Sequence, residues 1–381
     1  MDDWRHGGFG IYIHWPFCQA KCPYCDFNSH VSAQVDHDLW RKTLVEDIRF
    51  QSQGLEERTL DSIFFGGGTP SLMEPATVDA CITEIAKTFN LAENVEISLE
   101  ANPTSVEAEK FKGFAAAGVN RVSIGVQALN DEDLRCLGRL HSAQEARGAI
   151  NLARETFERM SFDLIYARQN QTIDAWQEEL ATAINLAADH LSLYQLTIED
   201  GTAFGALQAA GRLRGLPDDD LSSDMYLATQ EMCNEAGLTG YEVSNHAKPG
   251  MESRHNLIYW RYGDYLGIGP GAHGRISKDG ARLATEAVLM PTEWLRATRA
   301  AATKATEELS PEAQFTEMML MGLRLAEGVS ETRILEVNPG FDFARLYNLI
   351  DENLILRSEG RLTVQNENKI VLNQILKEIL W

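Results

Sequence analysis

The first 200 residues alternate between short apolar runs and longer amphipathic stretches. Among the amphipathic stretches, Trp176, Leu180, Ile184 and Ala187 recur at helical spacing and predict one buried stripe. Six strands alternating with five helices predict an α/β fold of repeated βα units, with a parallel sheet that is either open or curled into part of a barrel. The predicted strands are FGIYIHW (9–15), SIFFGGGTP (62–70), VEISLEANP (95–103), RVSIGVQ (121–127), MSFDLIYA (160–167) and HLSLYQLTI (190–198).

Each predicted strand ends in residues that could serve a site. Chemistry in folds of this kind gathers at the carboxyl ends of the strands, so these residues are expected to lie together. They are a cysteine-containing loop after the first strand, then Gly66 to Thr69, Glu100, Asn102, Gly125, Gln127, Asp163, Gln195 and Thr197.

The pattern changes in the second half of the chain. Residues 206–304 contain a turn-rich linker, a predicted helix over 221–237 and a polar, aromatic-rich stretch. Residues 305–381 predict three helices followed by two short strands around Glu359-Gly360, an order that suggests a small α+β, winged-helix-like domain. We therefore expect three parts, at 1–205, 206–304 and 305–381.

The charge balance limits the possible partners. The chain has 34 Lys and Arg against 56 Asp and Glu, a net charge of −22, and residues 305–381 carry 7 against 13. This argues against nucleic acid as a partner. No apolar run is long enough for a membrane span and no signal peptide is recognisable, so we expect a cytoplasmic protein that contacts a membrane only through its partners.

Three of the six cysteines, Cys18, Cys22 and Cys25, lie on one short loop. Three thiolates can hold three irons of a [4Fe-4S] cluster and leave the fourth iron open for another ligand. A zinc site with His14 or His30 as the fourth ligand is the alternative. The other cysteines, Cys81, Cys136 and Cys233, stand singly and are expected to be buried small apolar residues.

The stretch HNLIYW (255–260) is a candidate heme site. His255 offers an imidazole to iron, and Tyr259 and Trp260 could lie along a planar macrocycle. The alternative is a histidine with a purely structural role. His273 and His14 are rival ligands.

The spacing C-x3-C-x2-C, with Tyr24 before the last cysteine, resembles the signature of the radical S-adenosylmethionine (SAM) enzymes. The motifs IYIHWPFC, FFGGGTPSLM, SLEANP, RVSIGVQ, LGRLH and FDLIYA together resemble the HemN and HemW group over essentially the whole chain. The resemblance implies a partial (β/α)6 barrel, a [4Fe-4S] cluster and SAM. It further implies SAM contacts at Tyr12, Tyr24, Gly67, Gly68, Thr69, Glu100, Gln127, Arg139 and Asp163, and heme contacts at His255, Asn256, Tyr259 and Trp260.

The chain differs from its relatives in three ways. Two differences favour the HemW branch, and the third concerns the site. Coproporphyrinogen dehydrogenases of this group carry a further cysteine where this chain has Phe27, and they have a longer N-terminal arm. Relatives often read Gly-Leu-Pro where this chain has Ala167-Arg168-Gln169, so the loop after Asp163 is expected to differ in shape. The HemW branch implies a heme chaperone, and the alternative is an oxygen-independent coproporphyrinogen III oxidase. The chaperone role implies heme-acceptor proteins such as respiratory cytochromes and an electron donor for the cluster, and it leaves a homodimer open.

Overall fold

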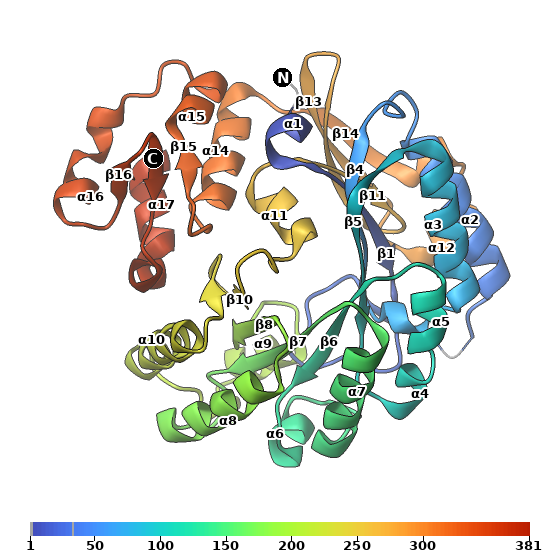
Figure 1. Cartoon of the computed structure of the whole chain (residues 1–381), viewed down its shortest axis with the longest axis horizontal. Coiled ribbons are helices and arrows are strands. Elements are labelled where there is room, and N and C mark those ends of the chain that lie inside the picture. The colour runs from blue at the N-terminus through green and yellow to red at the C-terminus, as the bar shows by residue number, and fades with distance from the viewer. Residues whose placement is uncertain (1–2, 33) are drawn as a thin grey trace.

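A computed structural model describes residues 3–32 and 34–381. Its centre is a sheet of seven parallel strands, flanked at both ends by antiparallel strands (Figure 1). The strand order of the whole sheet is β14-β13-β12-β11-β1-β4-β5-β6-β7-β8-β10-β9. The parallel strands are β1 (Phe9–Trp15), β4 (Thr59–Gly67), β5 (Asn90–Ala101), β6 (Arg121–Gln127), β7 (Arg159–Tyr166), β8 (His190–Gln195) and β11 (Asp264–Ile268). The antiparallel strands are β9 (Thr239–Gly240), β10 (Asn245–Ala247), β12 (His273–Lys278), β13 (Ala281–Ala287) and β14 (Thr303–Glu308).

The helices between successive parallel strands cover the outer face of the sheet. The prediction of alternating strands and helices is confirmed, and the predicted strands correspond to β1 and β4 to β8. These connections contain α2 (His37–Gln51), α3 (Pro75–Thr88), α4 (Ser105–Ala108), α5 (Phe111–Ala116), α6 (Asp131–Cys136), α7 (Ala143–Thr156) and α8 (Ile173–Leu186). Local sequence fixes several boundaries. For example, Ser142 and Glu145 form a capping box at the start of α7.

The predicted stripe on α8 packs inward as expected. Trp176 and Leu180 are fully buried, and Ile184 and Ala187 pack against the same core. The indole N–H of Trp176 donates a hydrogen bond of 2.9 Å to Thr229, which lies on α10 (Asp219–Glu235). α8 is thereby attached to α10 as well as to the sheet.

The seventh parallel strand was not predicted. β11 pairs with β1 in parallel, with Phe9 opposite Asp264 and Ile13 opposite Ile268. The stretch DYLGI is short, contains a glycine and follows a helix, so it has no alternating pattern of its own. The antiparallel strands β12 and β13 were also not predicted.

A second hydrophobic core lies in the C-terminal part of the chain. It combines residues 315–379 with Tyr262, and its strands β15 (Val329–Ser330), β16 (Leu356–Ser358) and β17 (Arg361–Thr363) form a separate three-stranded sheet. The strands predicted around Glu359-Gly360 are β16 and β17. The surrounding helices are α14 (Pro311–Gly322), α15 (Glu331–Val337), η2 (Phe343–Leu346), α16 (Tyr347–Asp351), η3 (Asn366–Val371) and α17 (Leu372–Leu380).

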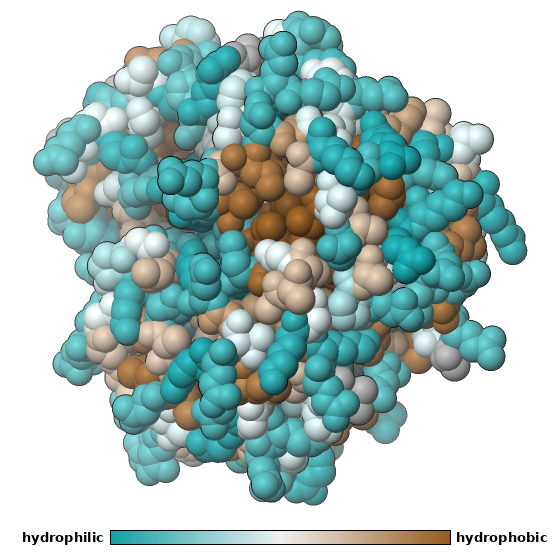
Figure 2. Space-filling view, turned by 45° about the vertical axis from the view of Figure 1, so that its right-hand side comes forward, coloured by the Kyte–Doolittle hydropathy of each residue, from teal (hydrophilic) through white to brown (hydrophobic). Residues whose placement is uncertain are grey.

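The short helix α11 (Arg254–Trp260) carries the HNLIYW stretch and lies between the large sheet and this C-terminal part (Figure 1). The remaining elements are α1 (Asp3–Gly7), β2 (Phe17–Cys18), β3 (His30–Val31), η1 (Pro70–Leu72), α9 (Ala203–Ala209), α12 (Pro291–Arg296) and α13 (Arg299–Ala302). The face seen in Figure 2 is mainly hydrophilic, with an apolar area in a hollow near its middle. No helix in the described part of the chain has the length and apolar character that a bilayer span requires.

Candidate functional site

The three clustered cysteines lie on the loop that follows β1. β2 and β3 pair in parallel and close the base of this loop, with Cys18 opposite Val31, and the amide of Cys25 bonds to the carbonyl of Cys22 at 3.1 Å. All three are half-buried thiols. Of the other cysteines, Cys81 and Cys233 are buried as predicted. The prediction for Cys136 was wrong, because it ends α6 on the exposed side of that helix.

Two of the cysteine sulfurs receive hydrogen bonds from the ends of neighbouring strands and helices. Thr69 donates to the sulfur of Cys18 at 3.4 Å, and Arg139 donates to the sulfur of Cys22 at 3.4 Å. Burial raises the pKa of Cys18, and the bond from Thr69 opposes that effect. Donors aimed at sulfur are the surroundings that tune cysteine-ligated iron centres, so the loop fits a cluster.

The glycine segment after β4 lies directly against the cysteine loop. A Cβ atom on Gly68 would lie 2.7 Å from the carbonyl oxygen of Phe17 and 3.1 Å from the sulfur of Cys18. Gly67 has φ +114°, and a Cβ there would meet the His14 ring at 2.6 Å. Both positions therefore exclude side chains, which lets the backbone of this segment pack directly against the cysteine loop.

Arg139 connects the ends of several strands at this edge. Its Nη2 donates to the side chain of Asn102 at 2.5 Å and to the carbonyl of Gly125 at 2.8 Å, and its Nη1 lies 3.5 Å from the hydroxyl of Tyr24. Gln127 has a positive φ of 73°, which is uncommon for a residue with a side chain. Its buried Oε1 has no hydrogen-bond partner among the described residues. An orphaned acceptor beside this hollow fits a ligand that donates a hydrogen bond.

Two buried carboxyl groups, those of Glu100 and Asp163, line the same hollow. Burial, together with the charge of Asp163, raises the pKa of Glu100 to about 8. Burial raises the pKa of Asp163 to about 6, opposed by hydrogen bonds from Ser192 and Ser123. The carboxylate of Glu100 accepts a bond from the amide of Gly67 at 3.2 Å. A buried acidic pair of this kind can bind a cationic group.

One hollow joins most of the predicted SAM residues to the cysteines. It encloses about 970 Å³ of space, part of it open to solvent. The predicted residues on its walls are Cys18, Cys22, Cys25, Tyr24, Gly67, Gly68, Thr69, Glu100, Gln127, Arg139 and Asp163. Asn102, Ser123 and His141 also line it but were not given a role from the sequence. Asn102 was recognised as a strand-end residue, and the other two gave no signal.

Tyr12 is the predicted SAM residue that does not line this hollow. Its hydroxyl donates to Nδ1 of His14 at 2.9 Å, and Nε2 of His14 donates to the carbonyl of Asn28 at 2.9 Å. Burial lowers the pKa of His14 to about 4. Both ring nitrogens of His14 are therefore engaged, and Tyr12 supports the cysteine loop through His14.

His255, the predicted heme ligand, is buried inside the curve of the sheet. Its Nδ1 lies 2.7 Å from the hydroxyl of Ser62 and its Nε2 lies 2.8 Å from the hydroxyl of Tyr259, and its ring stacks on Phe64 at 4.9 Å. Burial lowers its pKa to about 3. Asn256 and Trp260 are half-buried on the same helix. His273, the rival ligand, is exposed at the start of β12.

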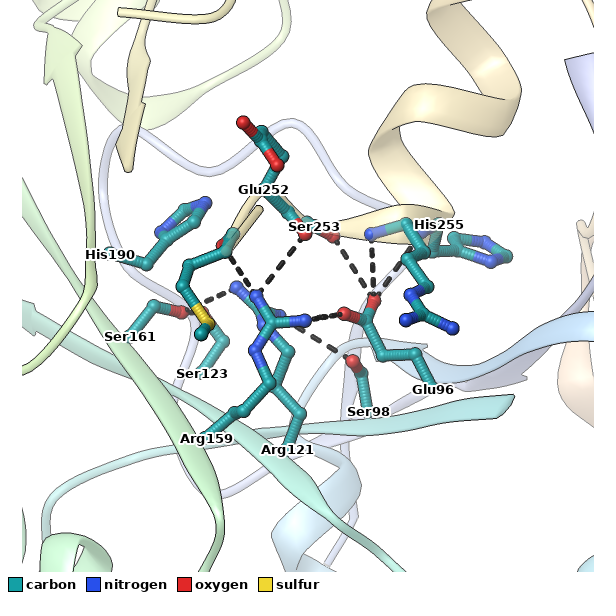
Figure 3. Close-up of polar contacts among 12 residues, drawn as sticks. Glu96, Ser98, Arg121, Ser123, Arg159, Ser161, His190, Glu252, Ser253 and His255 are labelled. Carbon is teal, nitrogen blue, oxygen red and sulfur yellow. Dashed lines mark hydrogen bonds and ion pairs between the residues drawn. The ribbon is translucent and has the colours of Figure 1, made fainter. Parts of the chain in front are cut away.

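An ion pair between the buried Glu96 and the partly buried Arg159 holds the start of α11 against the sheet (Figure 3). Glu96 accepts hydrogen bonds from the amides of Arg254 at 3.0 Å and His255 at 3.4 Å, and from the hydroxyl of Ser253 at 3.5 Å. Its other oxygen accepts a bond from Arg159 at 2.8 Å. Arg159 also donates to the carbonyls of Met251 and Glu252. A carboxylate from the distant strand β5 thus caps this helix, together with its own N-cap residue Ser253.

The fold and this site define a radical SAM protein, and residues 12–183 match the family model of the Radical SAM superfamily. Over 97% of its length, the chain is 37% identical to the heme chaperone HemW of Haemophilus influenzae and 36% identical to that of Escherichia coli, and it covers 97% of each. It therefore belongs to the HemW family. The mitochondrial radical S-adenosyl methionine domain-containing protein 1 of Bos taurus is 36% identical, with 87% of that protein covered.

A solved structure confirms the fold. Coproporphyrinogen III oxidase (HemN) of Escherichia coli superimposes with a TM-score of 0.81 over 97% of this chain and 89% of that one, at 21% sequence identity. Membership of the radical SAM superfamily implies a [4Fe-4S] cluster and SAM.

Proposed function

We propose that this protein is a heme chaperone, which binds heme and passes it to acceptor proteins such as respiratory cytochromes. The observation that carries the proposal is the full-length similarity to proteins named heme chaperone HemW, including that of Bacillus subtilis at 34% identity over 97% of this chain. Phe27 also supports it, because this exposed side chain stands where the oxidases of the group carry a further cysteine.

Cys18, Cys22 and Cys25 are the proposed cluster ligands. A bound cluster would supply an open iron for the amino and carboxylate groups of SAM. The backbone of Gly67 and Gly68 and the side chains of Thr69 and Glu100 would hold the methionine part of SAM. Gln127, Arg139 and Asp163 would line the remainder of that pocket, and Tyr24 would pack beside the loop.

Removing one thiol tests the cluster assignment. Cys22→Ala should abolish the broad iron–sulfur absorption after anaerobic reconstitution, because one iron loses its protein ligand. Cys81→Ala is the matched control, since this buried thiol lies on α3, outside the hollow, and its loss should leave iron and sulfide content unchanged. Equal iron and sulfide in both variants would contradict the assignment.

The proposed heme contacts are His255, Asn256, Tyr259 and Trp260 on α11. In the structure both ring nitrogens of His255 are engaged, so an iron bond would replace the hydrogen bond to Ser62 or to Tyr259. Such an exchange leaves a hydroxyl to find another partner, and that makes ligation sensitive to the position of α11.

An anaerobic heme titration of the cluster-loaded protein, followed at the Soret band, tests the proposed function. Saturable binding is expected in the wild type, with weaker binding or a changed spectrum in His255→Ala. His246→Ala, which removes another buried histidine, is the control and should bind as the wild type does. Without saturable binding in the wild type the chaperone role fails, and conversion of coproporphyrinogen III to protoporphyrinogen IX would establish the oxidase instead.

A further inference from the structure

A second pocket lies on the opposite side of α11 from the sheet. α1, α11, α14 and α15 contribute to its walls, which include Trp260, Arg261, Met318, Glu327, Val329 and Arg361. It encloses about 790 Å³ of space, part of it open to solvent. We call it the Trp260 pocket.

Residues of the HNLIYW stretch lie on two different sides of α11. His255 and Tyr259 are four residues apart and bond to each other on the sheet side of α11. Trp260 and Arg261 instead line the Trp260 pocket. The buried indole Nε1 of Trp260 has no hydrogen-bond partner among the described residues. Trp260 therefore offers this pocket an aromatic wall.

The pocket has an excess of cationic side chains on a chain whose net charge is −22. Arg261, Arg333 and Arg361 line it, against Glu327 and Glu336. These groups sum to +1 when His6, which also lines the pocket, is neutral. Binding of an anionic ligand is therefore more favourable in this pocket than on most of the protein surface.

Two of the arginines keep donors for such a ligand. Arg261 bonds to Glu327 through Nε and Nη2, at 2.9 and 2.8 Å. Arg361 uses Nε and Nη2 for the carbonyls of Glu327 and Gly328, and its Nη2 also lies 3.6 Å from the carboxylate of Glu327. The Nη1 groups of both arginines have no bond to any other described residue, and both side chains are about two-fifths exposed (41% and 39%).

We propose that the Trp260 pocket binds the propionate carboxylates of heme through Arg261 and Arg361, with the macrocycle against Trp260. This inference rests on the proposed heme-chaperone function and adds a second site to it, on the other side of α11 from His255. Guanidinium groups bind carboxylates through charge-assisted hydrogen bonds, and an indole face suits a flat ring. The capping of α11 by Glu96 fixes the pocket wall that carries Trp260.

Metal-free protoporphyrin IX is the appropriate probe, because without iron its binding does not depend on any axial ligand. Its fluorescence is titrated with the full-length, cluster-loaded protein, in parallel with its dimethyl ester, in which both carboxylates are blocked. Saturable binding of protoporphyrin IX is expected, with the ester bound at least about tenfold more weakly.

Variants locate the effect in the Trp260 pocket. Arg261→Ala and Arg361→Ala should each weaken protoporphyrin IX binding by about tenfold and leave binding of the ester unchanged. Glu327→Gln should strengthen binding, because it removes a carboxylate that competes for the same arginines. Arg361→Lys keeps the charge and should retain part of the affinity. Arg357→Ala is the matched control, since Arg357 makes an equivalent two-bond pair with Glu331 but does not line the pocket.

The outcomes separate this inference from the proposed function. If heme binds saturably but protoporphyrin IX and its ester bind alike, or the arginine variants bind as Arg357→Ala does, the pocket assignment is wrong and the chaperone proposal stands. If heme itself does not bind saturably to the wild type, the proposed function fails, and the pocket assignment fails with it.

Discussion

Glu100 and Asp163 show how individual residues in this hollow depart from their usual chemistry. Their carboxyl groups lie in one water-poor site, where the charge of Asp163 disfavours ionisation of Glu100. With a pKa of about 8, Glu100 is mostly protonated at neutral pH in the protein without ligands. A cationic ligand would favour the ionised form, so ligand binding and proton release at Glu100 are linked.

This pair predicts a pH dependence of stability. The folded-state pKa of Glu100 is raised above its unfolded value, so its contribution is complete below the unfolded pKa and is lost as pH rises toward about 8. Urea unfolding of the cofactor-free protein should therefore show the free energy of unfolding falling between pH 6 and 8, by up to about 1.4 kcal/mol per pH unit for this proton. Glu100→Gln should flatten that slope, whereas exposed Glu93→Gln should preserve it. An unchanged slope in Glu100→Gln would refute the assignment.

The cluster-loop cysteines and the strand-end residues could be predicted because they occupy fixed places in sequence patterns. The partners of His255 could not, because Ser62 is 193 residues away and the hydrogen bond exists only once α11 is placed on the sheet. Gln127 was predicted as a site residue from its strand end, but its positive φ depends on the tertiary contacts of that loop.

At the scale of elements, α11 is a short helix whose position depends on residues outside it. Seven residues are too few for a stable isolated helix. Ser253 caps it locally, while Glu96 and Arg159 attach its start to the strands β5 and β7. The same contacts therefore position both the sheet side and the pocket side of the HNLIYW stretch.

This arrangement predicts a large effect of Glu96→Ala. The substitution removes the buried carboxylate to which Arg159 and two amides of α11 donate, so we expect a loss of about 3 kcal/mol or more in the free energy of unfolding. Hydrogen exchange should accelerate at the amides of residues 254–260. Glu331→Ala, which removes a more exposed partner of Arg357, should cost about 1 kcal/mol or less. Similar losses in both variants, with unchanged exchange in α11, would rule out this role of Glu96.

The prediction of strands succeeded in the part of the chain where strands and helices alternate. It failed for β11 to β13, where the chain pairs again with the large sheet. The alternation of apolar runs identified β1 and β4 to β8, because buried parallel strands are continuous apolar segments. β11 to β13 lie in a glycine-rich region. β11 is a strand because β1 offers an edge for pairing, β12 pairs with β11, and β13 pairs with β12. That information is tertiary and has no local signal in the sequence.

At the scale of the whole molecule, two hydrophobic cores meet around α11. The first follows the large sheet, and the second contains Tyr262, two residues after the helix ends. Tyr262 also bonds to Glu317 on α14 and stacks with Arg282 on β13. The sequence predicted a compositional change near residue 305, but the large sheet continues through β14 to Glu308.

The position of β1 inside the sheet has a consequence for synthesis of the chain. Phe9 pairs with Asp264, so one edge of β1 stays unpaired until 264 − 9 = 255 further residues have been translated. At about 5–20 residues per second, that interval is roughly 13–50 s. During it the nascent chain presents an apolar strand with unpaired backbone groups, which is the type of surface that pairs with other chains. A ribosome that stalls before codon 264 would therefore release a fragment prone to aggregation.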